Sequence, residues 1–246
     1  LIIIKIRIAA NQQNSFQLLE IQNTLPELLA SFGNKKDIWQ SLLALKIDLS
    51  LDNSPKLLAQ LQALEAEVES HNNAYLSAVF NRALYYGFIR NNIIDVALDI
   101  AIKNKKQWLQ QEQHYSALEM QYNITNIRVT MMMDANSELL INNLESQVIK
   151  LEADLYYALI TEIKAIWYTR TGNAQHAYEI VNQALNDQNL ILSDNGRINL
   201  TSSLASISYQ LKNYAQTISL LNAVLQNPHL KSAKKIKQIK LTLAKA

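Results

Sequence analysis

The sequence predicts an all-α protein, an α-α superhelix of about six helix pairs closed by a C-terminal capping helix. Polar breaks recur about every 40 residues, and each separates two helix-length stretches with apolar residues at helical spacing. A fixed period in this range indicates a repeat array whose units bury their apolar faces on one another. The chain has only 4 glycines and 3 prolines, which argues against the many tight turns of a sheet protein. The breaks are Asn11–Asn14, Leu51–Ser54, Asn91–Asn92, Met133–Asn136, Thr171–Asn173 and Leu211–Asn213.

Each repeat is expected to contain a first and a second helix. The repeats are expected at residues 1–31, 35–70, 72–108, 112–150, 152–187 and 195–226, with the capping helix at 231–244. The helix pairs within them are 1–11 and 15–31, 35–50 and 55–70, 72–90 and 93–108, 112–132 and 135–150, 152–171 and 173–187, and 195–211 and 214–226. Ser54 and Pro55 form a favourable helix start, and Asp134 is the expected cap of the helix at 135–150.

An array of 246 residues fits one continuous domain, 1–246. The chain begins at Leu1 without an initiator Met, which suggests a piece of a longer protein or a mature form. Residues 1–8 alternate apolar and basic side chains, a pattern that favours a strand, while their position in the array favours a first helix.

The composition limits the classes of partner. The net charge of +2 is too near zero to indicate wholesale nucleic-acid binding, so no nucleic-acid partner is expected. No stretch approaches 18 uninterrupted apolar residues, so no membrane insertion is expected within this segment. The chain has no cysteine, which excludes disulfides and thiolate chemistry and fits either a periplasmic or a cytoplasmic location. With 25 Asn and 20 Gln, neutral amides rather than ion pairs dominate the polar faces.

Two segments carry a further pattern, in which small residues recur within helices joined by a polar turn. In the fifth repeat it comprises Ala165, Tyr168, Gly172, Asn173, Ala177, Ala184 and Leu185. In the sixth it comprises Leu204, Ala205, Leu211, Asn213, Tyr214, Leu225 and Pro228. This pattern resembles the tetratricopeptide repeat, in which small residues let two helix axes approach closely. The resemblance implies a right-handed superhelix that binds a protein or peptide, with the first helices lining its concave face.

The chain departs from that family at several places. Thr217 stands where one alanine of the second helix is expected, and Lys212 stands where the turn glycine is expected. The third repeat matches only at Ala97 and Asn91–Asn92, and the first, second and fourth match by length and periodicity alone. The period of about 40 exceeds the usual 34, so a HEAT-type array remains an alternative. Arrays with longer helices are similar to the sensory or partner-binding regions of bacterial signalling proteins.

The arginines suggest a binding surface. Four of the six, Arg82, Arg90, Arg128 and Arg170, lie on the expected first helices of three consecutive repeats, and a planar guanidinium suits carboxylates and aromatic rings. Several of these helices carry a second stripe of side chains beside the core stripe, which a helix buried on one side does not need. The expected partner-binding residues are Arg82, Tyr86, Arg90, Gln121, Arg128, Glu162, Ile166, Arg170, Asn199, Ser202, Ser206 and Tyr209.

We therefore expect a groove that holds a peptide or protein segment bearing a carboxylate. The alternative for the arginines is that they are solvated or lie over neighbouring apolar surface. The alternative for the function is a small-molecule-sensing domain attached to a cyclase, a kinase or a transcription regulator. The sequence contains no phosphate-binding glycine loop, nucleophile motif or histidine cluster, so no catalytic residue, metal site or cofactor is expected.

Overall fold

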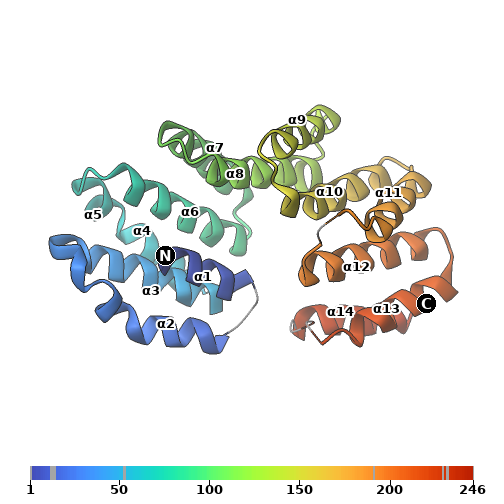
Figure 1. Ribbon diagram of the computed structural model, residues 1–246, viewed down its shortest axis with the longest axis horizontal. Helices are drawn as coiled ribbons and strands as arrows, with labels where there is room; N and C mark the ends of the chain where they lie inside the picture. The colour runs from blue at the N-terminus through green and yellow to red at the C-terminus, as the bar shows by residue number, and fades with distance from the viewer. Residues whose placement is uncertain are drawn as a thin grey trace. The chain divides into compact units, whose positions relative to one another are not determined.

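The computed structural model describes residues 2–11, 15–51, 54–190, 192–228, 230 and 233–245 (Figure 1). Within these ranges every regular element is helical and no strand occurs, so the predicted all-α class is confirmed. None of the described helices combines the length and the apolarity needed to cross a bilayer. The chain divides into two compact units, Leu1–Ile124 and Thr125–Ala246, which we describe separately.

Unit 1 is built from helices that pack against their neighbours in the chain. Its elements are α1 (Ile2–Asn11), α2 (Ser15–Leu28), the 3-10 helix η1 (Ala30–Lys35), α3 (Lys36–Leu51), α4 (Pro55–Ala63), α5 (Glu65–Ser70), α6 (Ala74–Arg90), α7 (Ile94–Gln110) and most of α8 (His114–Asn126). Expected first helices also contact one another, since α3 packs against both α1 and α6.

Unit 2 follows the same scheme. Its elements are the π-helical turn η2 (Ile127–Met132), α9 (Ser137–Lys150), the 3-10 turn η3 (Asp154–Tyr156), α10 (Tyr157–Arg170), α11 (Ala174–Asn186), α12 (Asp194–Gln210), α13 (Tyr214–Leu225) and α14 (Ala233–Leu243). Sequential helices α10, α11, α12, α13 and α14 pack in order, and α10 also packs against α12.

The structure differs from the expected helices in a few places. The helix expected at 55–70 is divided at Leu64, whose N–H bonds to Leu61 in a tight turn. The helix expected at 135–150 begins at Ser137, and Asp134 is not its cap residue. The Asp134 carboxylate instead accepts a bond of 2.8 Å from the Asn136 N–H, in the turn before the helix. Parts of the expected polar breaks, at 12–14 and 52–53, and the expected start of the capping helix, at 231–232, lie outside the described residues.

Five helix starts among the described residues are explained by side-chain caps. Ser54 accepts a hydrogen bond from the Lys56 N–H with Pro55 at the first helical position, which confirms the predicted start. Asn and Ser cap further helices in the same way, because their side-chain oxygens satisfy N–H groups of the first turn. These caps are Asn73, Asn173, Ser193 and Asn213.

Left-handed residues end most helices at regular intervals. Positive φ angles occur at Asn72, Asn92, Glu112, Met133, Glu152, Gly172 and Lys212. At five of these turns the residue after the left-handed one donates a hydrogen bond to the carbonyl five positions back, as in the bond of 2.8 Å from the Asn213 N–H to the Ser208 carbonyl. After Met133 the Asp134 N–H instead bonds to the Arg128 carbonyl, six positions back. Lys212 therefore adopts the conformation that Gly172 adopts one repeat earlier, although its side chain disfavours it. The spacing of about 20 residues corresponds to one helix and one turn.

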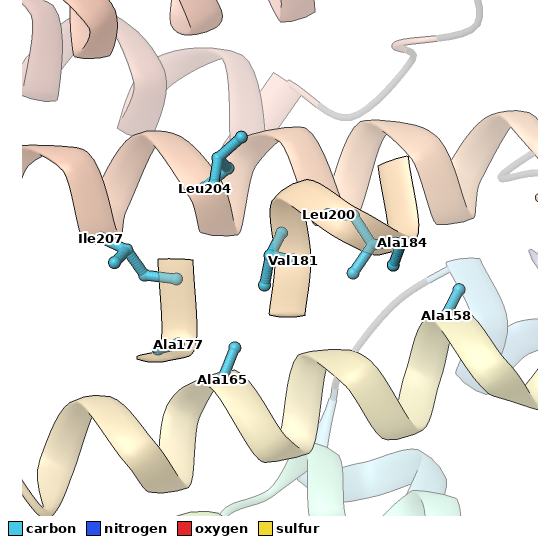
Figure 2. Packing of buried hydrophobic residues seen from close by; sticks show 8 residues of the cluster. All are labelled: Ala158, Ala165, Ala177, Val181, Ala184, Leu200, Leu204 and Ile207. Atoms are coloured by element: carbon cyan, nitrogen blue, oxygen red, sulfur yellow. The ribbon is translucent and has the colours of Figure 1, made fainter. Parts of the chain in front are cut away.

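The core of unit 2 forms where α10, α11 and α12 meet. Figure 2 shows its side chains pointing toward one another from the three helices. The cluster consists of Ala158, Ala165, Ala177, Val181, Ala184, Leu200, Leu204 and Ile207. Because half of these residues are alanines, the helices can approach closely. A second cluster, which includes Leu221 and Ile239, joins α12 to α13 and α14.

Unit 1 is held by aromatic rings and one buried amide. The rings of Phe32, Trp39, Tyr75 and Trp108 follow one another at centroid distances of 6.1, 6.2 and 5.6 Å and link η1, α3, α6 and α7. Asn104, which is fully buried, donates to the Ala78 carbonyl at 2.8 Å and accepts from the Trp108 indole at 3.0 Å. These bonds fix α7 against α6.

The left-handed turns lead to a prediction about stability. Gly172→Ala should lower the free energy of unfolding by about 1–2 kcal/mol, because a Cβ is disfavoured at positive φ even though the surrounding space is open. Lys212→Gly should raise the free energy of unfolding by up to about 1 kcal/mol, since it relieves the same backbone strain. Urea unfolding followed by circular dichroism measures both. Equal effects of the two substitutions would contradict the assignment.

Candidate functional site

The residues predicted to bind a partner fall in both units. Arg82, Tyr86, Arg90 and Gln121 lie in unit 1, and the other eight lie in unit 2. The two groups are therefore considered separately.

Arg82 lies inside unit 1 and is already paired. It is 7% exposed, and its Nη2 lies 2.5 Å from Oε1 of Glu119 on α8. The Tyr86 hydroxyl donates to the same carboxylate oxygen at 2.7 Å, and the guanidinium lies 5.8 Å from the Tyr86 ring centroid. Burial lowers the pKa of Arg82, but the charges of Glu119 and Tyr86 and the hydrogen bonds to both residues together outweigh it, so the pKa is raised. The carboxylate that Arg82 binds thus comes from the chain itself and joins α6 to α8.

The other two predicted residues of unit 1 have different surroundings. Arg90 is exposed at the end of α6, and partial burial of its guanidinium lowers its pKa. Gln121 is buried, and its side-chain oxygen accepts a bond of 2.6 Å from Lys105. The second stripe of α6 and α8 in unit 1 is therefore largely used for contacts within the unit.

Unit 2 contains a cavity of about 380 Å³ between α10, α12 and α14. Six of the predicted residues line it: Glu162, Ile166, Arg170, Asn199, Ser202 and Ser206. Its apolar surface comes from Ala165, Ile166, Ile207, Leu221 and Ile239. Ala165 and Ile207 belong also to the core cluster of Figure 2, so the packed core forms part of the cavity floor.

One end of the cavity holds two opposite charges. Lys235 on α14 donates a hydrogen bond of 2.6 Å to Oδ1 of Asn199 on α12. Glu162 on α10 lies close enough to interact with Lys235 electrostatically. Burial raises the pKa of Glu162 and lowers that of Lys235, and in each case the charge of the other residue opposes the shift. Both groups therefore carry their charges at a cost.

Arg170 lines the same cavity further along α10. Eight residues of helix separate it from Glu162, which corresponds to about 12 Å along the axis. Its guanidinium donates a hydrogen bond to the Thr130 carbonyl in the π-helical turn η2. Arg128 and Tyr209, also predicted, do not line the cavity: Arg128 is half-buried on η2, and the Tyr209 ring packs against Tyr214 at 5.5 Å.

The hydroxyl groups of the cavity share one orientation. Four of them donate their proton to the carbonyl four residues earlier in the same helix. These bonds run from Thr169 to Ala165, Ser202 to Ile198, Ser206 to Ser202 and Thr242 to Gln238, at 2.6, 2.6, 3.1 and 3.1 Å. Since a hydroxyl has one proton and two lone pairs, each of these oxygens can offer only acceptor positions to a ligand.

Part of the cavity was not predicted. Lys235, Gln238 and Thr242 come from α14, which was expected only as a capping helix. Their spacing on α14 repeats that of Glu162, Ala165 and Thr169 on α10, which is the only sequence signal that could have found them. Among the described residues, no three His, Asp or Glu side chains are grouped closely enough to hold a metal ion. No family model, curated protein or solved structure matches this chain.

The buried ion pair of unit 1 gives a stability prediction. Glu119→Gln should cost about 3–5 kcal/mol of unfolding free energy, because it leaves the Arg82 guanidinium buried without its counter-charge. The double substitution Arg82→Met with Glu119→Leu should cost less, since it removes both charges. Urea unfolding of Arg82→Met, Glu119→Leu, their double variant and the unchanged protein forms a double-mutant cycle. A single variant no less stable than the double one would exclude the proposed energetic role.

Glu162 gives a prediction that depends on pH. Its pKa in the folded protein lies above the ordinary value of 4.5, so the ionised form opposes folding at neutral pH and this penalty fades as pH falls toward 4.5. Glu162→Gln should therefore raise the Tm near neutral pH, and the gain should shrink in acid. Thermal unfolding across this range tests it, with Glu138→Gln on the exposed part of α9 as control. A lower Tm at neutral pH would contradict the prediction.

Proposed function

We propose that this chain is a non-enzymatic, tetratricopeptide-like helical repeat that binds a peptide or protein segment, and that the cavity of unit 2 makes the central contact. The repeat architecture is supported by the regular left-handed turns and by the contacts of α3 with α1 and α6 and of α10 with α12. In such an array the first helices line the concave face, as the resemblance implies. Of the cavity walls, α10 and α12 are the expected first helices of the fifth and sixth repeats, and α14 is the expected capping helix.

The observation that carries the binding proposal is the convergence of six predicted residues on this cavity. Their selection rested on the sequence alone, from a second stripe on separate helices. The cavity volume of about 380 Å³ lies within the range of ligand sites in proteins. The span of about 12 Å from Glu162 to Arg170 matches three to four residues of extended chain. An aliphatic floor with polar walls suits a peptide, which carries both apolar side chains and a polar backbone.

A second candidate is a small-molecule sensor that regulates an attached domain. The observation in its favour is that charged and hydroxyl groups converge on one cavity rather than along an open surface. The carboxylate-binding role expected for the arginines belongs, within this cavity, to Arg170. That role requires a ligand carboxylate to compete with the Thr130 carbonyl or to use the remaining N–H groups.

Peptide binding can be tested by filling the cavity. Ser202→Phe should block it, whereas Ser219→Phe on the exposed side of α13 leaves it open. Calorimetric titration with mixtures of tetrapeptides, blocked at both ends, should show binding to the unchanged protein and to Ser219→Phe. Ser202→Phe should bind at least tenfold more weakly.

Two outcomes would count against the proposal. Equal binding by the two variants would place the peptide elsewhere. Binding of small metabolites but of no peptide, with the same dependence on Ser202, would favour the sensor instead.

A further inference from the structure

Glu162 differs from Lys235 and Arg170, the other charged side chains of the cavity, which are bonded to acceptors of the protein. It makes no hydrogen bond or ion pair with any residue that the structure describes, and Lys235 acts on it only through its charge. The side chain is half-buried, which removes much of the water that would otherwise stabilise the charge. A carboxylate held in this way is stabilised by any ligand that brings a positive charge and N–H donors to it.

The hydroxyl groups that line the same cavity point to the same chemistry. Ser202 on α12 and Thr169 on α10 give their protons to backbone carbonyls, so their oxygens accept but do not donate. A ligand oxygen brought to these two groups would meet lone pairs on both sides. A ligand nitrogen that carries several protons would find acceptors on α10 and α12 at once.

The two cations of the cavity are held by acceptors of the protein itself. Lys235 is bonded to the side-chain oxygen of Asn199, and Arg170 to the Thr130 carbonyl. Arg170 lies about 12 Å along the helix from Glu162, beyond the distance over which exposed charges act strongly in physiological salt. Near Glu162 the one competing cation is therefore Lys235, among the residues that the structure describes.

We propose that this cavity binds a primary ammonium group on a short aliphatic stem, with Glu162 as counter-ion and the Ser202 oxygen as a further acceptor. The stem lies on the aliphatic surface of Ile166 and Ile239. The inference rests on the proposed function and deepens it, because a lysine side chain or the amino terminus of a peptide carries this group. A free small amine carries the same group, and the experiment separates the two sources.

The position of Lys235 makes the proposal easy to test, because it predicts effects of opposite sign at neighbouring residues. Removing the negative charge of Glu162 should weaken ammonium binding. Removing the positive charge of Lys235 should strengthen it, since one repulsive charge is lost. A carboxylate-binding cavity would show the reverse for both substitutions. The sign of the change in affinity at each residue therefore identifies the ligand class even when the affinities are modest.

The experiment uses the full chain and four proteins: unchanged, Glu162→Gln, Lys235→Gln and the control Glu138→Gln. The probes are n-butylammonium, butyrate, and a blocked Ala-Lys-Ala tripeptide with its norleucine analogue, titrated by calorimetry. The lysine tripeptide should bind at least tenfold more tightly than the norleucine analogue. Glu162→Gln should remove that preference, Lys235→Gln should strengthen lysine binding about threefold or more, and Glu138→Gln should change nothing.

Each result has a defined meaning. Binding of butylammonium as tight as that of the lysine tripeptide supports the ammonium site and identifies a free amine as its ligand. Equal binding of the lysine and norleucine peptides overturns the ammonium site while leaving peptide binding intact. Tighter binding of butyrate, weakened by Lys235→Gln, overturns it in favour of a carboxylate. Glu162→Gln is expected to be at least as stable as the unchanged protein, so a loss of binding does not arise from unfolding.

Discussion

Close packing of α10, α11 and α12 around small side chains is the constraint on which the rest of unit 2 depends. Ala165, Ala177 and Ala184 keep the helices near one another, and Val181, Leu200 and Leu204 fill the space that remains. Ala165 and Ile207 belong to this core and also line the cavity. The position of the polar walls is therefore fixed by the packed residues behind them. A change in the alanines would alter the core and the cavity together.

The sequence predicted what depends on local periodicity. Helix positions followed from the apolar stripes and the polar breaks, and Ser54 with Pro55 was recognised because a cap acts within a few residues. The division at Leu64 and the start at Ser137 were missed, since they depend on how one turn packs rather than on the pattern. The expectations of one continuous domain and of a concave binding face remain predictions.

The candidate site shows the same division between local and tertiary information. Six residues of the second stripe on α10 and α12 line one cavity, because helix geometry places them on one face, whereas Tyr209 of the same stripe does not. The same reasoning could not separate Arg82, which lies buried against Glu119, from Arg170, which is exposed. The difference comes from Glu119, 37 positions away in the sequence, and no rule of spacing connects the two residues. Likewise, nothing in α14 alone indicates that Lys235 meets Asn199.

The π-helical turn η2 shows how the chain accommodates an extra residue. Asn72, Asn92 and Glu112 are 20 positions apart, whereas Met133 follows Glu112 by 21 and Glu152 follows Met133 by 19. A π turn is the usual way in which a helix absorbs a one-residue insertion without losing its axis. The insertion is thus confined to Ile127–Met132. The later left-handed residues Glu152 and Gly172 again lie at multiples of 20 positions from Asn72. Such a bulge also frees backbone carbonyls from the regular ladder, and one of them, at Thr130, holds the guanidinium of Arg170. The one-residue bulge thereby supplies the backbone carbonyl that positions the charge of Arg170 at the edge of the cavity.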